Sequence, residues 1–255
     1  MRPAPAAVAA VLALAGLLAH AAALAPATAA GLAGTSTVLS ASVRTPDPDV
    51  SAWPPEDAGA AAERAERARA GLTADEVPAA ASGNLVTVPG STEAPRPAQR
   101  VRTVRVQFEE GLPVDGAAFA ELVMDVLNDE RGWGHDGSVV FARTDGEAEI
   151  SVVLASGATT DELCVPLRTM GEYSCGRNGR AVLNAERWSS GAEPFLAAGA
   201  DLTAYREYLV NHEVGHLLGR PHVTCPAPGT VAPVMVQQSI DLGGCLPNGW
   251  DALAG

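Results

Sequence analysis

The feature that most constrains this chain is a cluster of histidines near residue 215. Three of its five histidines fall between residues 212 and 222, in the run NHEVGHLLGRPH that begins at Asn211. Histidines four positions apart on a helix project to the same side, about one turn from each other. His212 and His216 have this spacing, so both imidazoles are expected to reach one metal ion.

Gly219 and Pro221, which follow His216 in the sequence, favour a sharp end to this helix. Gly219 can adopt a positive φ and turn the chain, and Pro221 cannot continue a helix. The turn is expected to bring His222 back towards the first two histidines as a third ligand. Three neutral imidazoles leave a fourth coordination position open, as in catalytic zinc sites. We therefore expect His212, His216 and His222 to bind Zn²⁺.

Glu213 directly follows the first of these histidines. It is rotated by about 100° from His212 on the helix, which places it poorly as a ligand and well as a neighbour of a water bound to zinc. A carboxylate there can take the proton of that water, orient it towards a carbonyl and return the proton to the leaving nitrogen. Histidines on the surface or in the core, without a metal, are the alternative, but they leave the regular spacing unexplained.

The composition excludes some partners. The formal charge is −13 and the pI is about 4.7, whereas binding to nucleic acid or to an anionic membrane surface needs clustered basic residues. The hydrophobic content of 47% is sufficient for a packed core. These values favour a folded domain and argue against a nucleic-acid partner. The chemistry expected of Glu213 points instead to a protein or peptide substrate.

Residues 1–30 resemble a targeting segment. Arg2 precedes a long apolar stretch, and small residues reach an A-x-A pattern at 27–29, which is typical of a cleavable secretory signal. The alternative is an uncleaved membrane anchor, because residues 6–25 match the ~20 needed to cross a bilayer. Both alternatives predict a secreted or extracytoplasmic protein, and the second adds a membrane tether.

Residues 31–98 are rich in Ala, Pro, Gly, Ser and Thr and contain few large apolar side chains. Such a segment buries too little surface to offset its ordering entropy, so we expect a mostly disordered spacer. An exception is residues 56–70, where Ala, Glu and Arg at helical spacing predict a solvated helix.

Residues 99–255 have the pattern of a folded domain. Alternating and β-branched apolar residues predict strands, and apolar residues spaced three and four apart predict helices. The expected strands are 101–108, 138–142, 150–154 and 181–184, and the expected helices are 119–127 and 202–218. Asp201 is the expected N-cap of the second helix. This order predicts one α+β domain, with a sheet packed on helices and the histidine-bearing helix at its centre.

The four cysteines are expected to form disulfides, because thiols in even number usually oxidise in an exported protein. Three pairings are possible. Cys164 and Cys175 flank a short loop, and Cys225 and Cys245 flank the segment after the histidines, so these two local pairings are favoured. Cysteine ligands for zinc are disfavoured because close C-x-x-C pairs are absent.

The motif H-E-x-x-H-x-x-G-x-x-H, which here spans 212–222 and includes Gly219, resembles that of the metzincin zinc peptidases. Those enzymes place a methionine in a tight turn beneath the metal, and Met235 looks like that residue. The runs LCVPL at 163–167 and VMVQQ at 234–238 are similar to an exported actinobacterial family that carries a domain of unknown function. That family is usually grouped with metzincin-like peptidases. The resemblance implies an α+β fold with a mixed sheet, a bound zinc and a peptidase-like site.

Three functions follow from these patterns. The first is an exported zinc metalloendopeptidase. The second is a zinc amide hydrolase that acts on cell-wall material with the same ligands and base. The third is a non-catalytic extracellular module whose zinc only stabilises the fold, and Glu213 disfavours it because a structural site needs no base.

Other polar and aromatic residues have simpler explanations. His135 and Asp136 are expected to be a loop pair rather than a second metal site. Trp188 and Trp250 are expected to be packing anchors rather than ligand platforms. Asn211 is expected either to steady the histidine-bearing helix or to contact substrate.

Overall fold

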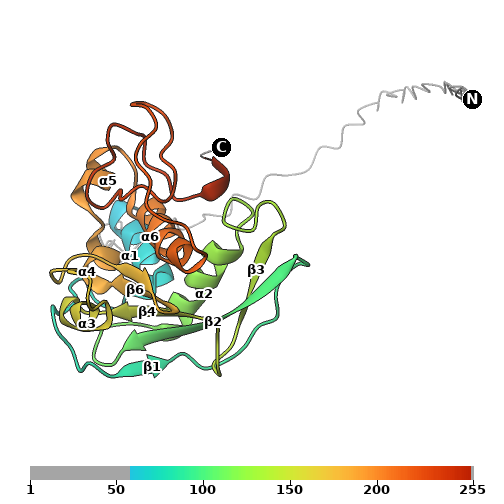
Figure 1. The fold of residues 1–255 in the computed structure, drawn as a ribbon. Coiled ribbons are helices and arrows are strands. Elements are labelled where there is room, and N and C mark those ends of the chain that lie inside the picture. Colours follow the sequence, from blue (N-terminus) through green and yellow to red (C-terminus); the bar gives the residue numbers. More distant parts are fainter. Residues whose placement is uncertain (1–57, 254–255) are drawn as a thin grey trace, which may run out of the picture. The chain divides into compact units, whose positions relative to one another are not determined.

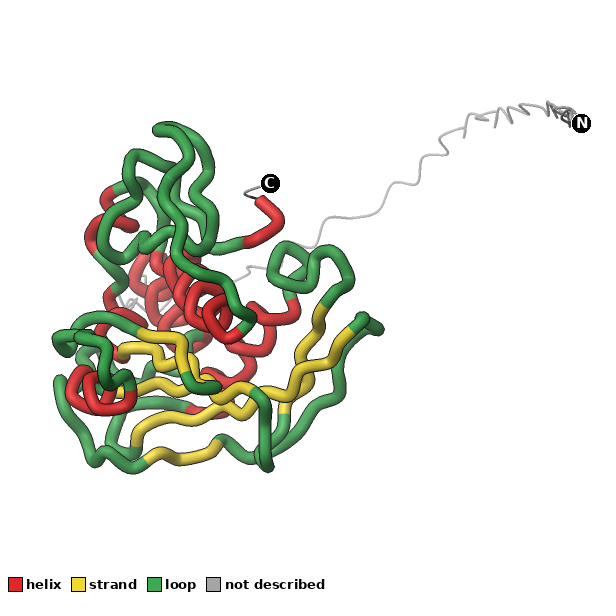
Figure 2. The backbone as a smooth tube through the Cα atoms, in the orientation of Figure 1, coloured by secondary structure: helices red, strands yellow, loops and turns green. Residues whose placement is uncertain are grey.

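The computed structural model describes residues 58–253 (Figure 1). The helices are α1 (Ala58–Arg69), α2 (Gly116–Asn128), α3 (Gly157–Leu163), α4 (Ala185–Ser190), α5 (Glu193–Ala197), α6 (Leu202–Leu217) and the 3-10 helix η1 (Asp251–Leu253). The strands are β1 (Leu85–Thr87), β2 (Arg100–Glu109), β3 (Val139–Arg143), β4 (Ile150–Ala155), β5 (Cys175–Arg177) and β6 (Arg180–Asn184). Long loops without helix or strand follow α6 (Figure 2). Among the described residues, no helix is both long and apolar enough to cross a membrane.

The strands form one mixed sheet. Its order is β1-β2-β4-β6-β5, and β3 also pairs with β2. β2, β3, β4 and β6 are parallel, whereas β1 is antiparallel to β2 and β5 is antiparallel to β6. The expected α+β class, with a mixed sheet packed on helices, is therefore confirmed. Among the described strands, β5 has β6 as its one partner, so it forms an edge of the sheet.

The main core lies between the sheet and the helices α2 and α6 (Figure 1). Val106 and Val152 enter it from the strands, and Phe119 and Val210 enter it from the helices. A smaller cluster on the other face of the sheet contains Val153, Val182 and the two cysteines at 164 and 175. Since α6 is buried along most of its length, it is the central helix that the sequence predicted.

The predicted strands and the two predicted helices of the domain are present, with ends shifted by a few residues. Asp201 caps α6 as expected, because its side chain accepts a hydrogen bond of 2.8 Å from the backbone N–H of Ala204. The sequence pattern does not reveal α3, α4, α5 or β5. These elements have seven, six, five and three residues, which is too short for a helical or strand period to stand out.

The folded part of the chain begins earlier than the predicted boundary at residue 99. The helix predicted at 56–70 is confirmed as α1, which has no buried residue. The rest of the predicted spacer differs from the expectation, because β1 lies within 31–98 and Leu72 and Val88 are buried in the main core. The prediction of disorder was wrong here because the few apolar residues of this segment are far apart in sequence and become buried only through contact with the rest of the domain. The predicted targeting segment at 1–30, and spacer residues 31–57, lie outside the described residues.

Polar contacts tie α1 to α6. The Arg206 side chain is buried, donates from Nε to the carbonyl of Trp188 at 2.7 Å and forms an ion pair with Glu66 of α1. The Glu66 carboxylate also accepts a hydrogen bond of 3.2 Å from the Thr203 hydroxyl. The Trp188 indole donates to the carbonyl of Ala70 at 2.9 Å. The segment that follows residue 57 is thus fastened to the helix that carries the histidines.

Substitutions at two glycines test whether the segment that follows residue 57 is part of the fold. Gly71 and Gly83 both have positive φ, at 74° and 76°. A Cβ atom at Gly71 would lie 2.7 Å from the carbonyl oxygen of Asp115, whereas a Cβ atom at Gly83 would meet nothing within 4 Å. We expect Gly71→Ala to lower the free energy of unfolding by about 3 kcal/mol and Gly83→Ala to lower it by about 1 kcal/mol. Denaturant unfolding of the full chain measures both, and two negligible effects would contradict a folded segment.

Candidate metal centre

The local sequence shapes the end of α6 that carries the histidines. The helix ends at Leu217, and Gly219 follows with a φ of 84°, the left-handed conformation that glycine adopts without strain. The backbone N–H of Arg220 then donates to the carbonyl of Gly215 at 2.9 Å, which reverses the chain direction. The predicted stop at Gly219 is therefore confirmed, and the turn carries His222 back towards the helix.

The turn brings three imidazoles together. Nε2 of His222 lies 3.2 Å from Nε2 of His212 and 3.0 Å from Nε2 of His216. Among the described residues, these three form the one group of three or more His, Cys, Asp or Glu side chains whose ligand atoms converge. In the structure, the three histidines that were predicted to be metal ligands therefore lie close together.

Backbone carbonyls fix the tautomers of two of these rings. Nδ1 of His212 lies 2.8 Å from the carbonyl oxygen of Val234, and Nδ1 of His216 lies 3.0 Å from that of Arg220. A carbonyl oxygen can only accept, so each neutral ring carries its proton on Nδ1 and leaves Nε2 unprotonated. His222 can donate from Nε2 to one of them at most. Lone pairs on Nε2 of these rings therefore point towards one another, and a cation bound between them would stabilise the arrangement. Histidines that bind a metal ion commonly donate a hydrogen bond from their other ring nitrogen in the same way.

Burial keeps the rings neutral. Burial, with a smaller contribution from the neighbouring His216 and His222, lowers the pKa of His212 to about 3. Burial is also the main reason why the pKa values of His216 and His222 are lowered. Since only the neutral imidazole binds a metal ion, all three rings are in the binding-competent form at neutral pH.

Glu213 lies beside the histidines and is itself buried, with 5% of its surface exposed. Burial raises the pKa of its carboxyl group to about 8. The carboxylate forms no hydrogen bond with the other described residues, and it lines the same cavity as the three rings. A buried carboxyl group without a fixed partner is able to exchange a proton with a ligand in that cavity.

Met235 lies directly against the helix turn that connects His212 and His216. A Cβ atom at Gly215 would be 2.6 Å from the sulfur of Met235 and 2.6 Å from the indole carbon Cζ2 of Trp133. The Tyr208 hydroxyl donates to the carbonyl of Val236 at 3.2 Å and accepts from the backbone N–H of Gln238 at 3.0 Å. These contacts fix the turn that presents the Val234 carbonyl to His212.

The histidines and Glu213 line a cavity of about 560 Å³. The rest of its lining comes mainly from two segments, one within residues 167–176 and one that contributes Gln237, Ser239 and Ile240. A larger hollow of about 800 Å³ beside α2 is lined by arginines, carboxylates and small residues and contains no histidine or cysteine. The converging imidazoles therefore make the smaller cavity the candidate functional site.

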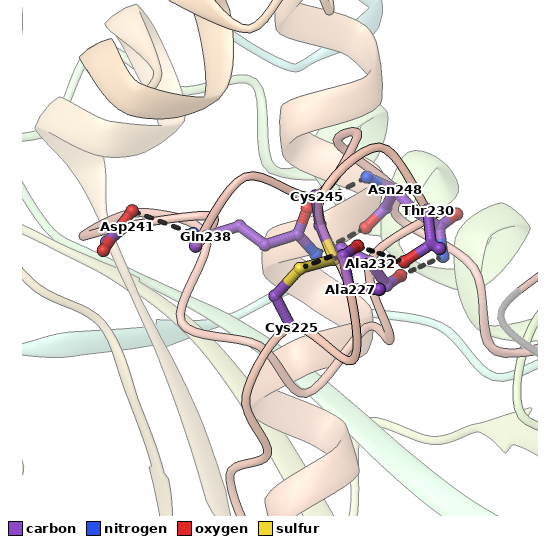
Figure 3. The surroundings of a disulfide bond; sticks show 9 residues. Cys225, Ala227, Thr230, Ala232, Gln238, Asp241, Cys245 and Asn248 are labelled. Carbon is purple, nitrogen blue, oxygen red and sulfur yellow. Dashed lines mark hydrogen bonds between the residues drawn. A yellow bond between two sulfur atoms is a disulfide. The ribbon is translucent and has the colours of Figure 1, made fainter.

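Both favoured disulfide pairings are present. The sulfur atoms of Cys164 and Cys175 are 1.95 Å apart, and those of Cys225 and Cys245 are 2.11 Å apart. The second disulfide closes the loop that follows His222 (Figure 3). The first stands beside the cavity, because Cys175 lines it. No free cysteine is found among the described residues.

The remaining sequence candidates lie away from the cavity. His135 pairs with Asp251 at 3.4 Å, and Trp188 and Trp250 are buried in the core, as expected for a loop residue and two packing anchors. Asn211 donates from its side chain to the carbonyl of Gly249 at 2.8 Å, so it holds the helix in place.

Sequence reasoning missed two residues that position the site, Tyr208 and Trp133. Tyr208 precedes His212 by four residues, so helical spacing was a signal that could have identified it. Trp133 donates from its indole N–H to the carbonyl of Asn211 at 2.9 Å and reaches α6 from a distant loop. No sequence pattern indicates that contact.

Gly215 gives a test of the contact between α6 and Met235. Alanine favours a helix over glycine by about 1 kcal/mol, so Gly215→Ala would stabilise an unobstructed helix. Here the added methyl group would collide with Met235 and Trp133, and we expect a net loss of about 2 kcal/mol. Denaturant unfolding gives the sign directly, and a stabilised variant would contradict the close packing.

The chain was also compared with known proteins. No curated protein and no solved structure matches it significantly. A family model does match, over residues 72–244, which is more than half of the chain. The match begins before residue 99, in agreement with the early start of the fold, and it fulfils the expected resemblance to a family with a domain of unknown function. The chain therefore belongs to the family described as "Protein of unknown function (DUF3152)".

Proposed function

We propose that this protein is a metzincin-like zinc metalloendopeptidase, in which His212, His216 and His222 bind the metal and Glu213 is the catalytic base. The observation that carries the proposal is the convergence of three Nε2 atoms in a cavity that also contains a buried carboxylate. The contact between Met235 and Gly215 supports the metzincin resemblance, because Met235 then lies beneath the proposed ligands.

The donor atoms fit zinc. A tetrahedral ion with Zn–N bonds of ~2.0–2.1 Å separates its nitrogen ligands by about 3.3–3.4 Å. The Nε2 atoms of His222 and its two neighbours are 3.0 and 3.2 Å apart, so small movements suffice to bind the ion. Imidazole nitrogens are preferred ligands of zinc, and three of them leave a position free for water or substrate.

In the proposed hydrolysis, the metal ion and Glu213 have different roles. When bound, zinc would supply a Lewis acid that polarises the scissile carbonyl and makes water acidic near neutral pH. The Glu213 carboxylate takes a proton from the attacking water and passes it to the leaving nitrogen. Its raised pKa suits this exchange, and a nearby cation would lower that pKa again and favour the ionised base.

Strand β5 supports a peptide as the substrate. Its residues Cys175 and Gly176 line the cavity, and only one of its two edges is paired within the described sheet. An extended peptide can add to such an edge through backbone hydrogen bonds, which holds a carbonyl in a defined place. This feature favours peptide bonds over the alternative substrate, an amide of cell-wall material.

The proposal includes location outside the cytoplasm. The apolar stretch and A-x-A pattern of residues 1–30 support export, either as a cleaved signal or as an anchor. The two disulfides support an oxidising compartment.

Measuring the zinc content of variants tests whether the three histidines bind the metal. We expect zinc-loaded wild type to retain about one ion per chain and His216→Ala to retain almost none, because two imidazoles bind zinc weakly. His135→Ala is the matched control and should keep its zinc, since His135 pairs with Asp251 away from the cavity. Elemental analysis after gel filtration measures the content. A full ion in His216→Ala would exclude this ligand set.

Cleavage of an unbiased peptide library, with and without a chelator, tests the activity. We expect wild type to cleave only without the chelator, and Glu213→Gln to keep its zinc while losing at least about 100-fold in kcat. Survival of both the metal and the activity in Glu213→Gln would contradict the role of the base. Absence of any peptide cleavage by zinc-loaded wild type would leave the peptidase proposal without support.

A further inference from the structure

One wall of the cavity is a loop whose shape is fixed by the fold. We call residues 164–175 the rim loop, because the disulfide between Cys164 and Cys175 closes it. The Asp161 carboxylate accepts a hydrogen bond of 2.8 Å from the backbone N–H of Gly171. The Asn184 side chain donates to the carbonyl of the same glycine at 2.8 Å. The loop therefore presents its side chains to the cavity in a defined arrangement.

Large apolar side chains are exposed on this loop and on a second segment that lines the cavity. Leu167 and Met170 of the rim loop are 51% and 68% exposed, and Ile240 of the second segment is 49% exposed. All three line the cavity. Isolated exposed apolar residues are ordinary, but a group of them around a concave site is typical of a surface that a ligand covers.

The side chains that line the cavity indicate which kind of ligand group it can bind. Apart from the three histidines, its ionisable side chains are Arg168, Tyr173, Tyr208 and Glu213. Leu167, Met170 and Ile240 belong to the same lining, together with the uncharged polar residues Thr169, Ser174, Gln237 and Ser239. A ligand group that lies against Leu167, Met170 and Ile240 meets mainly methyl and methylene groups, which suits an uncharged side chain.

The rim loop also leads directly into the edge strand. Cys175 is both the last residue of the loop and the first residue of β5. A peptide that pairs with β5 would therefore lie close to the rim loop, and every second side chain of the peptide would share one face, because side chains alternate along an extended chain.

We propose that the rim loop and Ile240 bind a bulky apolar side chain of the substrate next to the cleaved bond. The preferred substrates are thus peptides with Leu, Met or Phe at that position. This inference rests on the proposed peptidase function and specifies the substrate class of the same site. The disulfide contributes by holding Leu167 and Met170 in place when no substrate is bound.

Profiling of peptide cleavage tests the preference. Zinc-loaded wild type should cleave peptides with a bulky apolar residue at one position at least about tenfold faster, in kcat/KM, than matched peptides with Gly or Asp there. The double variant Leu167→Ser/Met170→Ser should lose most of this difference and keep its zinc. Leu246→Ser is the matched control, because Leu246 is 50% exposed but does not line the cavity.

A binding measurement separates recognition from chemistry. With zinc-loaded Glu213→Gln, fluorescence anisotropy should show tighter binding of a Leu-containing peptide than of its Asp counterpart, and Leu167→Ser/Met170→Ser in that background should remove the difference. If the double variant fails to fold, Ile240→Ser, which changes another apolar residue of the lining, serves the same purpose.

The outcomes distinguish the two proposals. If wild type cleaves peptides without an apolar preference, or if the rim-loop and Ile240 variants retain the preference, this inference is overturned while the peptidase function stands. If zinc-loaded wild type cleaves no peptide at all, both are overturned.

Discussion

The close packing of the last turns of α6 is the constraint on which the rest of the structure depends. On one side, a Cβ atom at Gly176 of β5 would lie 2.1 Å from the carbonyl oxygen of Glu213. On the other side, a Cβ atom at Gly215 would lie 2.6 Å from the sulfur of Met235. The absence of a side chain at both positions lets the helix touch the edge strand and the following turn together. The position of the helix relative to the cavity is thereby fixed.

This packing determines the chemistry of the histidines. Because the turn around Met235 is pressed against the helix, the Val234 carbonyl reaches Nδ1 of His212, and the end of the helix offers the Arg220 carbonyl to His216. Two backbone acceptors thus decide which nitrogen of each ring carries the proton. The lone pairs then point to one place without any charged partner. Burial of the same helix lowers the pKa of His212 and raises that of Glu213, so a single feature prepares both the proposed ligands and the proposed base.

The surrounding loops depend on covalent and long-range contacts rather than on regular secondary structure. The disulfide between Cys225 and Cys245 restrains the segment that follows His222 (Figure 3), and the disulfide between Cys164 and Cys175 restrains the rim loop. On the far side of α6, the ion pair between Arg206 and Glu66 fastens α1 to the same helix. The rim loop is thus anchored to the sheet through Cys175 of β5, and the segment around Gln238 is anchored to α6 through the Tyr208 hydroxyl.

The sequence by itself determined the features that depend on residues close together in the chain. The i and i+4 spacing of His212 and His216, the stop at Gly219 and the cap at Asp201 all act within a few residues, so their physical effects can be inferred without a fold. In the same way, alternating and β-branched apolar residues indicated the longer strands, and apolar residues three and four apart indicated α2. Tertiary structure alone decided which distant groups meet: the contact of Trp133 with α6, the order of the sheet, and the burial of Leu72 and Val88 in the core. Their energies arise from surfaces that fit together only after the chain has folded, and no short stretch of sequence records that fit.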